Sequence, residues 1–342
     1  MPVGVAVVGC GSTARRRHLP VWASLPGARL AAVVSRDAGR REEAARTYGA
    51  LRAYADWRDA LADPDVDAID ICLPHPNHTD VAIAAARAGK HILCEKPLAT
   101  TLGDGRRMVE AAQTAGVVLM PFHNMRLGGA ARRAIELVRG GAIGRPTLVR
   151  GVMAHGGPDA SDPTRQWFLD ASSGGGAVLD LGPHMFDLLA VAMPTRAQRL
   201  RANLRSVSAG SVEKDGLLDI EFQDGAMAQI ALSWSHVAGR ETRLVLQGER
   251  GVLQLNLLLA PDPSPNGPTA PLVLATAGPP AAVQYPDPAE SQEPCSLFLR
   301  SIAGTGSGVT AEDGLETMRY VDAAYRSQRS DGAWAALNRE VP

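Results

Sequence analysis

Residues 3–14 read VGVAVVGCGSTA, and this stretch decides which fold we expect. The run Val3–Val8 is apolar and rich in valine, which is typical of a strand buried on both faces of a sheet. A turn with the spacing GxGxxA follows directly and leads into a helical pattern. In such a turn Gly9 permits the sharp bend, Gly11 lets a pyrophosphate approach the backbone, and Ala14 lets helix and strand pack closely.

The place of this turn, between a strand and a helix near residue 1, favours a dinucleotide site over a glycine turn without a ligand. Phosphates would lie at the N-terminus of the helix, where Ser12 and Thr13 follow the second glycine. The basic run Arg15–Arg17 continues this helix, and it forms either a solvated face or a contact with a cofactor phosphate.

Outward from this turn, strand-like and helix-like segments alternate up to about residue 121. The expected strands are 29–35, 68–73, 91–94 and 117–120. Helical patterns separate them at 40–48, 79–88 and 103–115. Alternation at this spacing predicts an α/β domain with a doubly wound parallel sheet.

The later part of the chain has a different pattern of expected helices and strands and is interpreted as α+β. Helices are expected at 130–139 and 310–326, and strands at 147–153, 217–222, 226–234 and 242–247. Residues 260–293 are rich in proline and alanine and are expected to form a long surface excursion. We therefore predict a Rossmann NAD(P)-binding domain over residues 1–122 and a substrate-binding and oligomerisation domain over residues 123–342.

Composition narrows the class of protein. The chain has 342 residues, of which 45% are hydrophobic and 21% charged, and its net charge is −1, as in ordinary globular proteins. This balance provides no field that would attract nucleic acid or an anionic membrane. Four scattered cysteines, no leader-like start and no long apolar run predict a cytoplasmic protein with free thiols.

The end of the second expected strand bears on the choice of cofactor. An acid there would bind the ribose 2′-hydroxyl of NAD, but this strand ends at Ser35 and Arg36. A guanidinium and a hydroxyl suit a 2′-phosphate, so we predict NADP. Asp37 follows one residue later and could reach a ribose, which leaves NAD open.

Two loops after later strands carry polar side chains toward the same crevice. The first loop contributes Leu73, Pro74, Asn77 and His78 as candidates. Glu95 and Lys96 follow the next strand, where the Lys96 ammonium could polarise a carbonyl or a hydroxyl. The alternatives are a helix cap at Asn77 or His78 and a surface salt bridge between Glu95 and Lys96.

The second half of the chain carries one further polar pattern. Three glycines at 174–176 precede Asp180, His184 and Asp187, which share one face if this segment is helical. A carboxylate beside an imidazole can orient the ring and hold its pKa near neutrality, as general acid–base catalysis requires. The same face could equally be structural.

Together these segments resemble the Gfo/Idh/MocA family, named for glucose–fructose oxidoreductase, inositol dehydrogenase and rhizopine catabolism. The matching segments are GCGSTA at 9–14, AGKHILCEKP at 88–97, GGAIGRP at 140–146, GGGAVLDLGPHMFDLL at 174–189 and the helix at 311–327. The resemblance implies a Rossmann domain followed by an α/β domain with a largely antiparallel open sheet. Because such sheets often pair subunits, it also implies a homodimer or a homotetramer.

The resemblance implies roles for the polar residues. As the catalytic residues, His184 would exchange a proton with the substrate hydroxyl, Lys96 would hydrogen-bond the reacting oxygen, and Asp180 would bind a neighbouring hydroxyl. Glu95 and the loop at 73–78 would line the cofactor crevice. The candidates for the substrate wall are Arg126, His155 and Trp167. Trp167 could instead belong to the core, and no metal is assigned.

The implied function is hydride transfer between NADP, or NAD, and a secondary alcohol or ketone of a sugar, inositol or related polyol. One alternative is a redox-neutral lyase or epimerase-like reaction on tightly bound NAD. The other is a regulator that senses the cofactor without turning it over. Residues 123–127 read HNMRL where many relatives carry an Asn-Arg-Arg-Phe type of run, a departure in a segment that borders the substrate.

Overall fold

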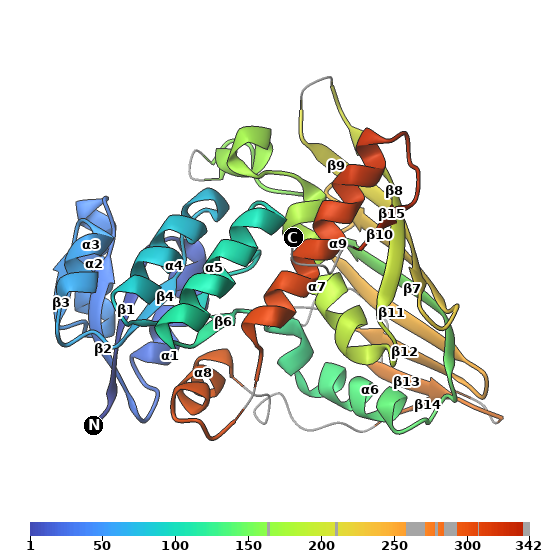
Figure 1. Cartoon of the computed structure of the whole chain (residues 1–342), viewed down its shortest axis with the longest axis horizontal. Helices are drawn as coiled ribbons and strands as arrows, with labels where there is room; N and C mark the ends of the chain where they lie inside the picture. The colour runs from blue at the N-terminus through green and yellow to red at the C-terminus, as the bar shows by residue number, and fades with distance from the viewer. Residues whose placement is uncertain are drawn as a thin grey trace. The chain divides into compact units, whose positions relative to one another are not determined.

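The computed structural model describes residues 1–162, 165–208, 211–257, 271–277, 280–283, 293–306 and 308–337. The chain divides into two compact units (Figure 1). Unit 1 comprises Met1–His123 and Glu293–Leu315, and unit 2 comprises Asn124–Gln292 and Glu316–Pro342. The predicted single boundary after residue 122 assigns all later residues to the second domain, whereas the chain returns to unit 1 at Glu293–Leu315. That return is anchored by Phe298, which packs edge-on against Trp22 with ring centroids 6.4 Å apart.

Unit 1 is built on a parallel sheet of six strands in the order β3-β2-β1-β4-β5-β6. The strands are β1 (Val3–Val8), β2 (Ala28–Val34), β3 (Arg52–Tyr54), β4 (Ala68–Ile71), β5 (His91–Cys94) and β6 (Leu119–Pro121). This order is that of a doubly wound dinucleotide-binding sheet, which confirms the predicted fold. Val8 pairs with Ile71 and Ile71 with Cys94, so the loops after β1, β4 and β5 leave the sheet at one edge.

Helices connect these strands. They are η1 (Ala14–His18), α1 (Leu19–Trp22), α2 (Ala38–Tyr48), α3 (Trp57–Ala62), η2 (His75–Asn77), α4 (His78–Arg87) and α5 (Leu102–Ala115). Helix α8 (Pro294–Ile302) also belongs to unit 1 but comes later in the chain. The turn between β1 and η1 requires glycine at position 9. Gly9 has a φ of +106°, and a Cβ atom there would lie 2.4 Å from the carbonyl oxygen of Cys72. This close approach brings the first loop against the end of β4.

Unit 2 contains a sheet of nine strands in the order β14-β13-β12-β11-β7-β10-β9-β8-β15. The strands are β7 (Pro146–Ala154), β8 (Ala197–Ser206), β9 (Glu213–Phe222), β10 (Met227–Ser233), β11 (Glu241–Gly248), β12 (Val252–Asn256), β13 (Leu272–Ala275), β14 (Ala281–Ala282) and β15 (Ala335–Ala336). Strands β7 and β10 are parallel, and the other neighbouring pairs are antiparallel. The prediction of a largely antiparallel open sheet is thereby confirmed.

Helices cover one side of this sheet, as Figure 1 shows for α6, α7 and α9. The helices of unit 2 are η3 (Met125–Leu127), α6 (Gly129–Arg139), η4 (Gln166–Leu169), η5 (Ala171–Ser173), α7 (Ala177–Ala192) and α9 (Ala311–Arg329), the last of which begins in unit 1. Helix α7 contacts β7, β9 and β10. Helices α7 and α9 are joined by Phe186 and Tyr320, whose rings stack with centroids 4.9 Å apart.

The expected surface excursion at 260–293 is wrong where the structure describes it. Strands β13 and β14 fall in this range and extend the sheet beyond β12. Leu272 in β13 is fully buried, because it faces the helix-covered side of the sheet. The rest of the range lies outside the described residues, apart from a few positions next to these strands.

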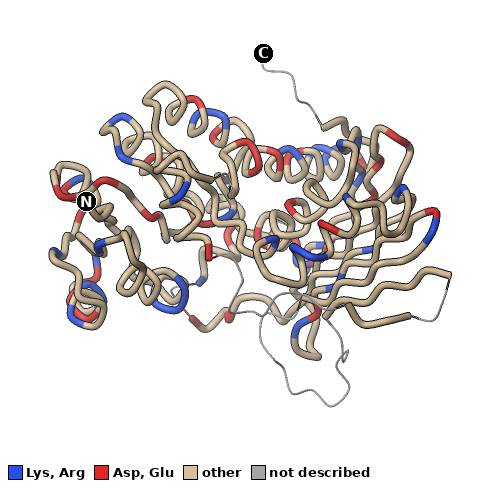
Figure 2. Tube along the Cα trace, turned by 90° about the horizontal axis from the view of Figure 1, so that it is seen from below, with Lys and Arg blue, Asp and Glu red and all other residues tan. Residues whose placement is uncertain are grey.

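Charged residues of both signs are interspersed over both units (Figure 2), in line with the net charge of −1. Some of them form ion pairs between neighbouring strands, such as Arg201 with Asp219 at 2.9 Å. None of the helices in the described part of the chain combines the length and the hydropathy that a membrane-spanning segment needs.

Candidate active site

The glycine turn after β1 opens onto free space. Ser12 and Thr13 are exposed, whereas Ala14 is fully buried at the start of η1. A Cβ atom built at Gly11 would meet nothing within 4 Å. The backbone of this turn is therefore accessible to a ligand, and the arrangement fits the pyrophosphate of a dinucleotide.

The end of β2 carries cationic groups and a capped helix. Arg36 is exposed, and Arg41 donates from Nη1 to the carbonyl oxygen of Ser35 at 2.7 Å. Asp37 caps α2, because its carboxylate accepts a hydrogen bond from the backbone N–H of Arg40 at 2.9 Å. The carboxylate that could have met a ribose is thus engaged at the helix terminus.

The pKa of the Cys10 thiol is affected by these cationic side chains. Burial raises its pKa to about 11, while the positive charges of Arg15, Arg41 and Arg40 act in the opposite direction. Three guanidinium groups therefore act on the turn that follows β1, from η1 and from the first turns of α2. This setting favours an anionic ligand.

His78 joins the loop after β4 to the loop after β5. Its ring is fully buried, with Nδ1 lying 2.9 Å from the Pro97 carbonyl oxygen and Nε2 lying 2.9 Å from the Leu73 carbonyl oxygen. Burial lowers the pKa of His78, and a neutral ring donates to one of these carbonyls at a time. Neither Asn77 nor His78 caps α4 through its side chain. Pro74 precedes η2 and is half-buried.

Glu95 points into the interior of unit 1 and does not form a surface salt bridge. Its Oε1 lies 3.0 Å from Nε2 of His18, and its Oε2 accepts a hydrogen bond from the backbone N–H of Lys96 at 3.0 Å. On the other side of the imidazole, Nδ1 of His18 lies 2.8 Å from Oδ2 of Asp70. Trp22 donates from Nε1 to the same Asp70 oxygen at 2.6 Å.

The charges in this cluster stabilise one another. Burial opposes ionisation of Glu95, yet the hydrogen bond and charge of His18 lower the pKa of Glu95 to about 2. Burial likewise opposes protonation of His18, but the carboxylate of Asp70 raises the pKa of His18 well above its usual value. His18, Asp70 and Cys72 each offer one atom that could bind a metal ion, and these three atoms lie within 4.8 Å of one another. His18 and Asp70 are already hydrogen-bonded to each other.

In unit 2, α7 places Asp180, His184 and Asp187 on one face, as the spacing predicts. Burial increases along this face, from a half-buried Asp180 to an Asp187 that is 2% exposed. Oδ2 of Asp180 accepts a hydrogen bond from Nε1 of Trp234 at 3.3 Å. The indole therefore orients the Asp180 carboxylate, which lies one helical turn before His184.

The first turn of α7 is capped by a residue from another element. Oε1 of Glu213, at the start of β9, accepts hydrogen bonds from the Val178 N–H and the Tyr325 hydroxyl, both at 2.9 Å. Gly176 precedes the helix with a φ of +118°, and a Cβ atom there would lie 2.3 Å from the Glu213 carboxylate. The last of the three glycines is therefore required by this cap.

The candidates for the substrate wall lie around the same helix. Nε of Arg126 lies 3.5 Å from Oδ2 of Asp187, and both side chains are buried. Nδ1 of His155 accepts a hydrogen bond from the Gly157 N–H at 2.9 Å. Trp167 is half-buried and stacks on Phe168 at 3.8 Å.

Aromatic side chains connect this wall to the helix. The ring of Phe168 meets Trp234 edge-on at 6.2 Å, and Trp234 bonds Asp180. A Cβ atom at Gly157 would lie 3.0 Å from Cβ of Trp234, which places the 155–157 segment against the same indole. The structure thus gathers His155, Trp167 and Asp180 around Trp234.

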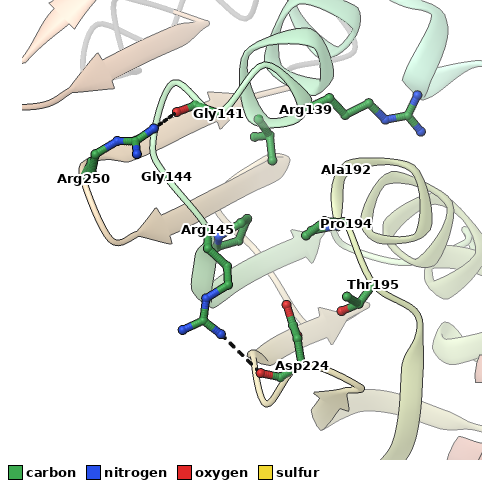
Figure 3. A pocket seen from close by; sticks show the side chains of 11 residues that line it. Arg139, Gly141, Gly144, Arg145, Ala192, Pro194, Thr195, Asp224 and Arg250 are labelled. Carbon is green, nitrogen blue, oxygen red and sulfur yellow. Dashed lines mark hydrogen bonds between the residues drawn. The ribbon is translucent and has the colours of Figure 1, made fainter.

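Figure 3 shows a cavity of about 480 Å³ in another part of unit 2. It includes Ala192 and Thr195, at the C-terminal end of α7, about 18 Å along the helix from Asp180. Arg250, which also lines this cavity, donates to the carbonyl oxygen of Gly141 at 2.7 Å. This cavity is not part of the candidate site.

Four residues of these networks are missing from the sequence-based candidates, namely His18, Asp70, Glu213 and Trp234. Asp70 has a visible signal, since it is a carboxylate within the apolar strand 68–73. The others show no local pattern, because each acts on a partner far away in the chain.

The fold and site define an α/β dinucleotide-binding protein with a second, largely antiparallel domain. Residues 3–123 match the model of an oxidoreductase family with an NAD-binding Rossmann fold, and residues 131–254 match the GFO/IDH/MocA C-terminal domain. The chain belongs to the Gfo/Idh/MocA family of oxidoreductases, which confirms the resemblance seen in the sequence.

Individual relatives are sugar oxidoreductases. The chain is 30% identical to D-xylose 1-dehydrogenase (NADP(+)) 2 of Haloferax volcanii over 89% of its length and 90% of that protein. It is 38% identical to levoglucosan dehydrogenase of Pseudarthrobacter phenanthrenivorans, over 43% of its length and only 38% of the relative. It superposes on aldose-aldose oxidoreductase from Caulobacter crescentus complexed with glycerol with a TM-score of 0.85 and 27% identity, over 98% of this chain and 100% of that one.

Proposed function

We propose that this protein is a nicotinamide-dependent dehydrogenase or reductase that acts on a secondary alcohol or ketone of a sugar or related polyol. The carrying observation is the Asp180–His184 face of α7, joined with an open dinucleotide turn on the same chain. Sugar oxidoreductases among the relatives support this substrate class. When bound, the nicotinamide would supply or accept the hydride.

The side chains of this protein would manage the proton and the reacting oxygen. His184 would take the proton of the substrate hydroxyl during oxidation and return it during reduction. The Lys96 ammonium would hydrogen-bond the reacting oxygen and stabilise the charge that develops there. Asp180, oriented by Trp234, would accept a hydrogen bond from a neighbouring hydroxyl.

We propose NADP as the preferred cofactor. Ser35 and Arg36 follow β2, where the 2′-substituent of the adenosine ribose lies in this fold. Asp37 caps α2, and Arg40 and Arg41 add positive charge at this end of the site. The relative from Haloferax volcanii, which matches over most of the chain, bears NADP(+) in its name. The phosphates would contact Gly9, Gly11, Ser12, Thr13 and Ala14.

The substrate wall would contain aromatic and polar groups. Trp167 would present a face of its ring to the C–H groups of a sugar, since it already stacks on Phe168. His155 would lie in this wall with its ring oriented by the hydrogen bond that Nδ1 accepts from the Gly157 N–H. Arg126 would act through Asp187, with which it is paired, and so fix the end of the catalytic face.

We also propose that the uncovered side of the nine-stranded sheet pairs two copies of this chain. Leu217 is 60% exposed and Met227 is 54% exposed on that side. Ala231 lies between Leu217 and Val152 in the strand register, so apolar side chains adjoin across three strands. Sedimentation analysis of the protein and of Leu217→Asp tests this pairing. A monomeric unaltered protein would contradict it.

The activity is tested by titrating the purified protein with NADPH and NADH and then assaying turnover on a panel of sugars and polyols. We expect tighter binding of NADPH and cofactor-dependent turnover, with Arg36→Ala weakening NADPH by about ten-fold and NADH little. Preference for NADH in the unaltered protein would contradict the NADP assignment. Binding without turnover on any polyol would contradict the enzyme assignment itself.

A further inference from the structure

His18 has no part in the proposed chemistry, yet it lies at the centre of a buried cluster of ionisable side chains in unit 1. Its ring is fully buried beneath the loop that carries Lys96. One ring nitrogen faces Asp70 and the other faces Glu95. The ring of Phe122 packs on the imidazole at 4.2 Å, which closes the cluster from the side of β6.

The donors around this cluster determine where its protons lie. Oδ2 of Asp70 accepts from the Trp22 indole, and Oε2 of Glu95 accepts from the Lys96 N–H, so neither oxygen carries a proton. The bond between Asp70 and His18 then requires a proton on Nδ1. The remaining proton lies between Nε2 of His18 and Oε1 of Glu95, and the acidity of Glu95 assigns it to the ring.

We propose that His18 is a positioning residue for Lys96. Its imidazolium bonds both Asp70 and Glu95, and Glu95 in turn holds the backbone N–H of Lys96. These hydrogen bonds connect Lys96 to Asp70, within β4, and to Trp22, in α1, both of which are fully buried. The inference rests on the proposed role of Lys96 in substrate oxidation or reduction.

The other end of the Lys96 turn also has a buried partner, since Nδ1 of His78 lies 2.9 Å from the carbonyl oxygen of Pro97. His78 can only hold the chain beyond Lys96, whereas Glu95 acts on the peptide N–H of Lys96 itself. Loss of the His18 bond would leave Glu95 free to rotate and would release that peptide. The Lys96 ammonium would then sample positions away from the reacting oxygen.

Two variants separate the two bonds of His18. The amide nitrogen of glutamine can occupy the position of Nε2 and donate to Glu95, so His18→Gln keeps the link to Lys96. The amide nitrogen of asparagine can occupy the position of Nδ1 and donate to Asp70, so His18→Asn breaks that link. Both variants remove the same charge from the same place. Each variant keeps one bond of His18 and loses the other, so an effect confined to His18→Asn reports the Glu95 bond and not the loss of charge that both variants share.

The readout is the carbon-13 signal of Lys96 after reductive methylation, which does not require activity. The chain has three lysines, Lys90, Lys96 and Lys214, and Lys96→Arg assigns the relevant signal. We expect the Lys96 signal to shift or broaden in His18→Asn and to stay in place in His18→Gln. Lys90 in unit 1 and Lys214 in unit 2 are internal controls that should not move.

Turnover gives the second readout. We expect kcat to fall by about ten- to a hundred-fold in His18→Asn, with His18→Gln close to the unaltered protein and NADPH binding retained in both. An unchanged Lys96 signal and kcat in His18→Asn would overturn the inference. If the unaltered protein shows no turnover while the Lys96 signal responds, the proposed function fails and the positioning role stands.

A direct measurement covers the case in which neither variant folds. Nitrogen-15 spectra of the unaltered protein at about pH 7, above the usual pKa of histidine, should show His18 with protons on both ring nitrogens. A neutral His18 ring at this pH would overturn the inference, because a single N–H cannot bond both carboxylates.

Discussion

The two units hold their functional side chains in different ways. Lys96 stands on a turn after the four-residue strand β5, where regular backbone hydrogen bonds end. Buried polar side chains replace them, with Glu95 and His18 before the lysine and His78 after it. His184 instead stands in the middle of the 16-residue helix α7, whose backbone fixes its spacing from Asp180.

Substitutions should therefore disturb the two units for different physical reasons. The support of Lys96 consists of charges in the interior of unit 1, so it depends on protonation and on every partner being present. The support of α7 is mainly apolar packing, such as the contact of Phe186 with Tyr320. We therefore expect unit 1 to respond strongly to changes of charge, and α7 to respond mainly to changes of volume.

The largest effect is expected for the two side chains that would carry the proposed proton and oxygen chemistry, Lys96 and His184. Lys96→Met and His184→Ala should each lower kcat by about 10²- to 10⁴-fold, because each removes a group that would stabilise the transition state in the proposed reaction. Binding of NADPH should remain. The double variant should lose little more than the worse single variant, since residues that act as a unit are not additive.

Steady-state kinetics and fluorescence titration measure these effects. Lys90→Met is the matched control, because Lys90 precedes β5 and bonds the carbonyl oxygens of Asp63 and Val66. That variant should keep its rate. Near-normal rates in Lys96→Met or His184→Ala would show that the assigned roles are wrong.

The next effect concerns the free energy of unfolding and is specific to the buried charges of unit 1. Asp70→Asn removes one charge from a buried ion pair with little change in volume, and such breaks cost about 3–5 kcal/mol. Urea unfolding followed by circular dichroism measures the free energy of unfolding. Asp37→Asn, a substitution of the same type at an exposed helix cap, should cost well under half as much. Equal losses in the two variants would contradict the account of the buried cluster.

Much of this site could be predicted from the sequence because its signals are local. The glycine spacing at 9–14 gave the dinucleotide turn, and the three-to-four-residue spacing of Asp180, His184 and Asp187 gave one helical face. The doubly wound parallel sheet of unit 1 followed from the alternation of strand and helix patterns. Each of these features is encoded within a few residues, where backbone geometry alone relates sequence to structure.

The supporting contacts could not be predicted because they join distant segments. His18 meets residues 52 and 77 positions away, and Trp234 meets Asp180 across 54 positions. Short elements were also missed, such as β3, which has three residues and no clear alternation. Tertiary pairing, and not local propensity, decides both kinds of feature.

The charged cluster should also make stability depend on pH, with a sign that follows from its pKa values. The pKa of His18 is raised in the folded state, so its contribution is complete below about pH 6.5 and is lost as the pH rises above that value. The slope cannot exceed about 1.4 kcal/mol per pH unit for one proton. Glu95 contributes above its usual pKa of 4.5 and loses that contribution as the pH falls toward about 2.

Urea unfolding at several pH values tests this dependence. The difference in unfolding free energy between the unaltered protein and His18→Gln should shrink as the pH rises from about 6.5 to 9.5. Groups outside this cluster titrate equally in both proteins and cancel in this difference. A difference that stays constant over this range would mean that His18 holds no additional proton in the folded state.

The smallest effect is expected at Glu213, the buried carboxyl that caps the first turn of α7. Burial raises the pKa of Glu213, so its ionised form is not strongly favoured where it lies. Glu213→Gln keeps an oxygen that can accept from the Val178 N–H and the Tyr325 hydroxyl. The substitution should therefore cost about 0.5–2 kcal/mol, in the range of an ordinary helix cap, and leave kcat almost unchanged.

Glu213→Ala is the matched variant, since it leaves both donors unpaired in the interior, at about 1–3 kcal/mol for each. Comparing Glu213→Gln with Asp70→Asn then decides whether the two units really differ. A loss at Glu213→Gln as large as that at Asp70→Asn would mean that α7 also depends on a buried charge. A small loss at Glu213→Gln and a large one at Asp70→Asn would mean that only the Lys96 side is held by ionisation, because the same exchange of carboxylate for amide was made at a buried site in each unit.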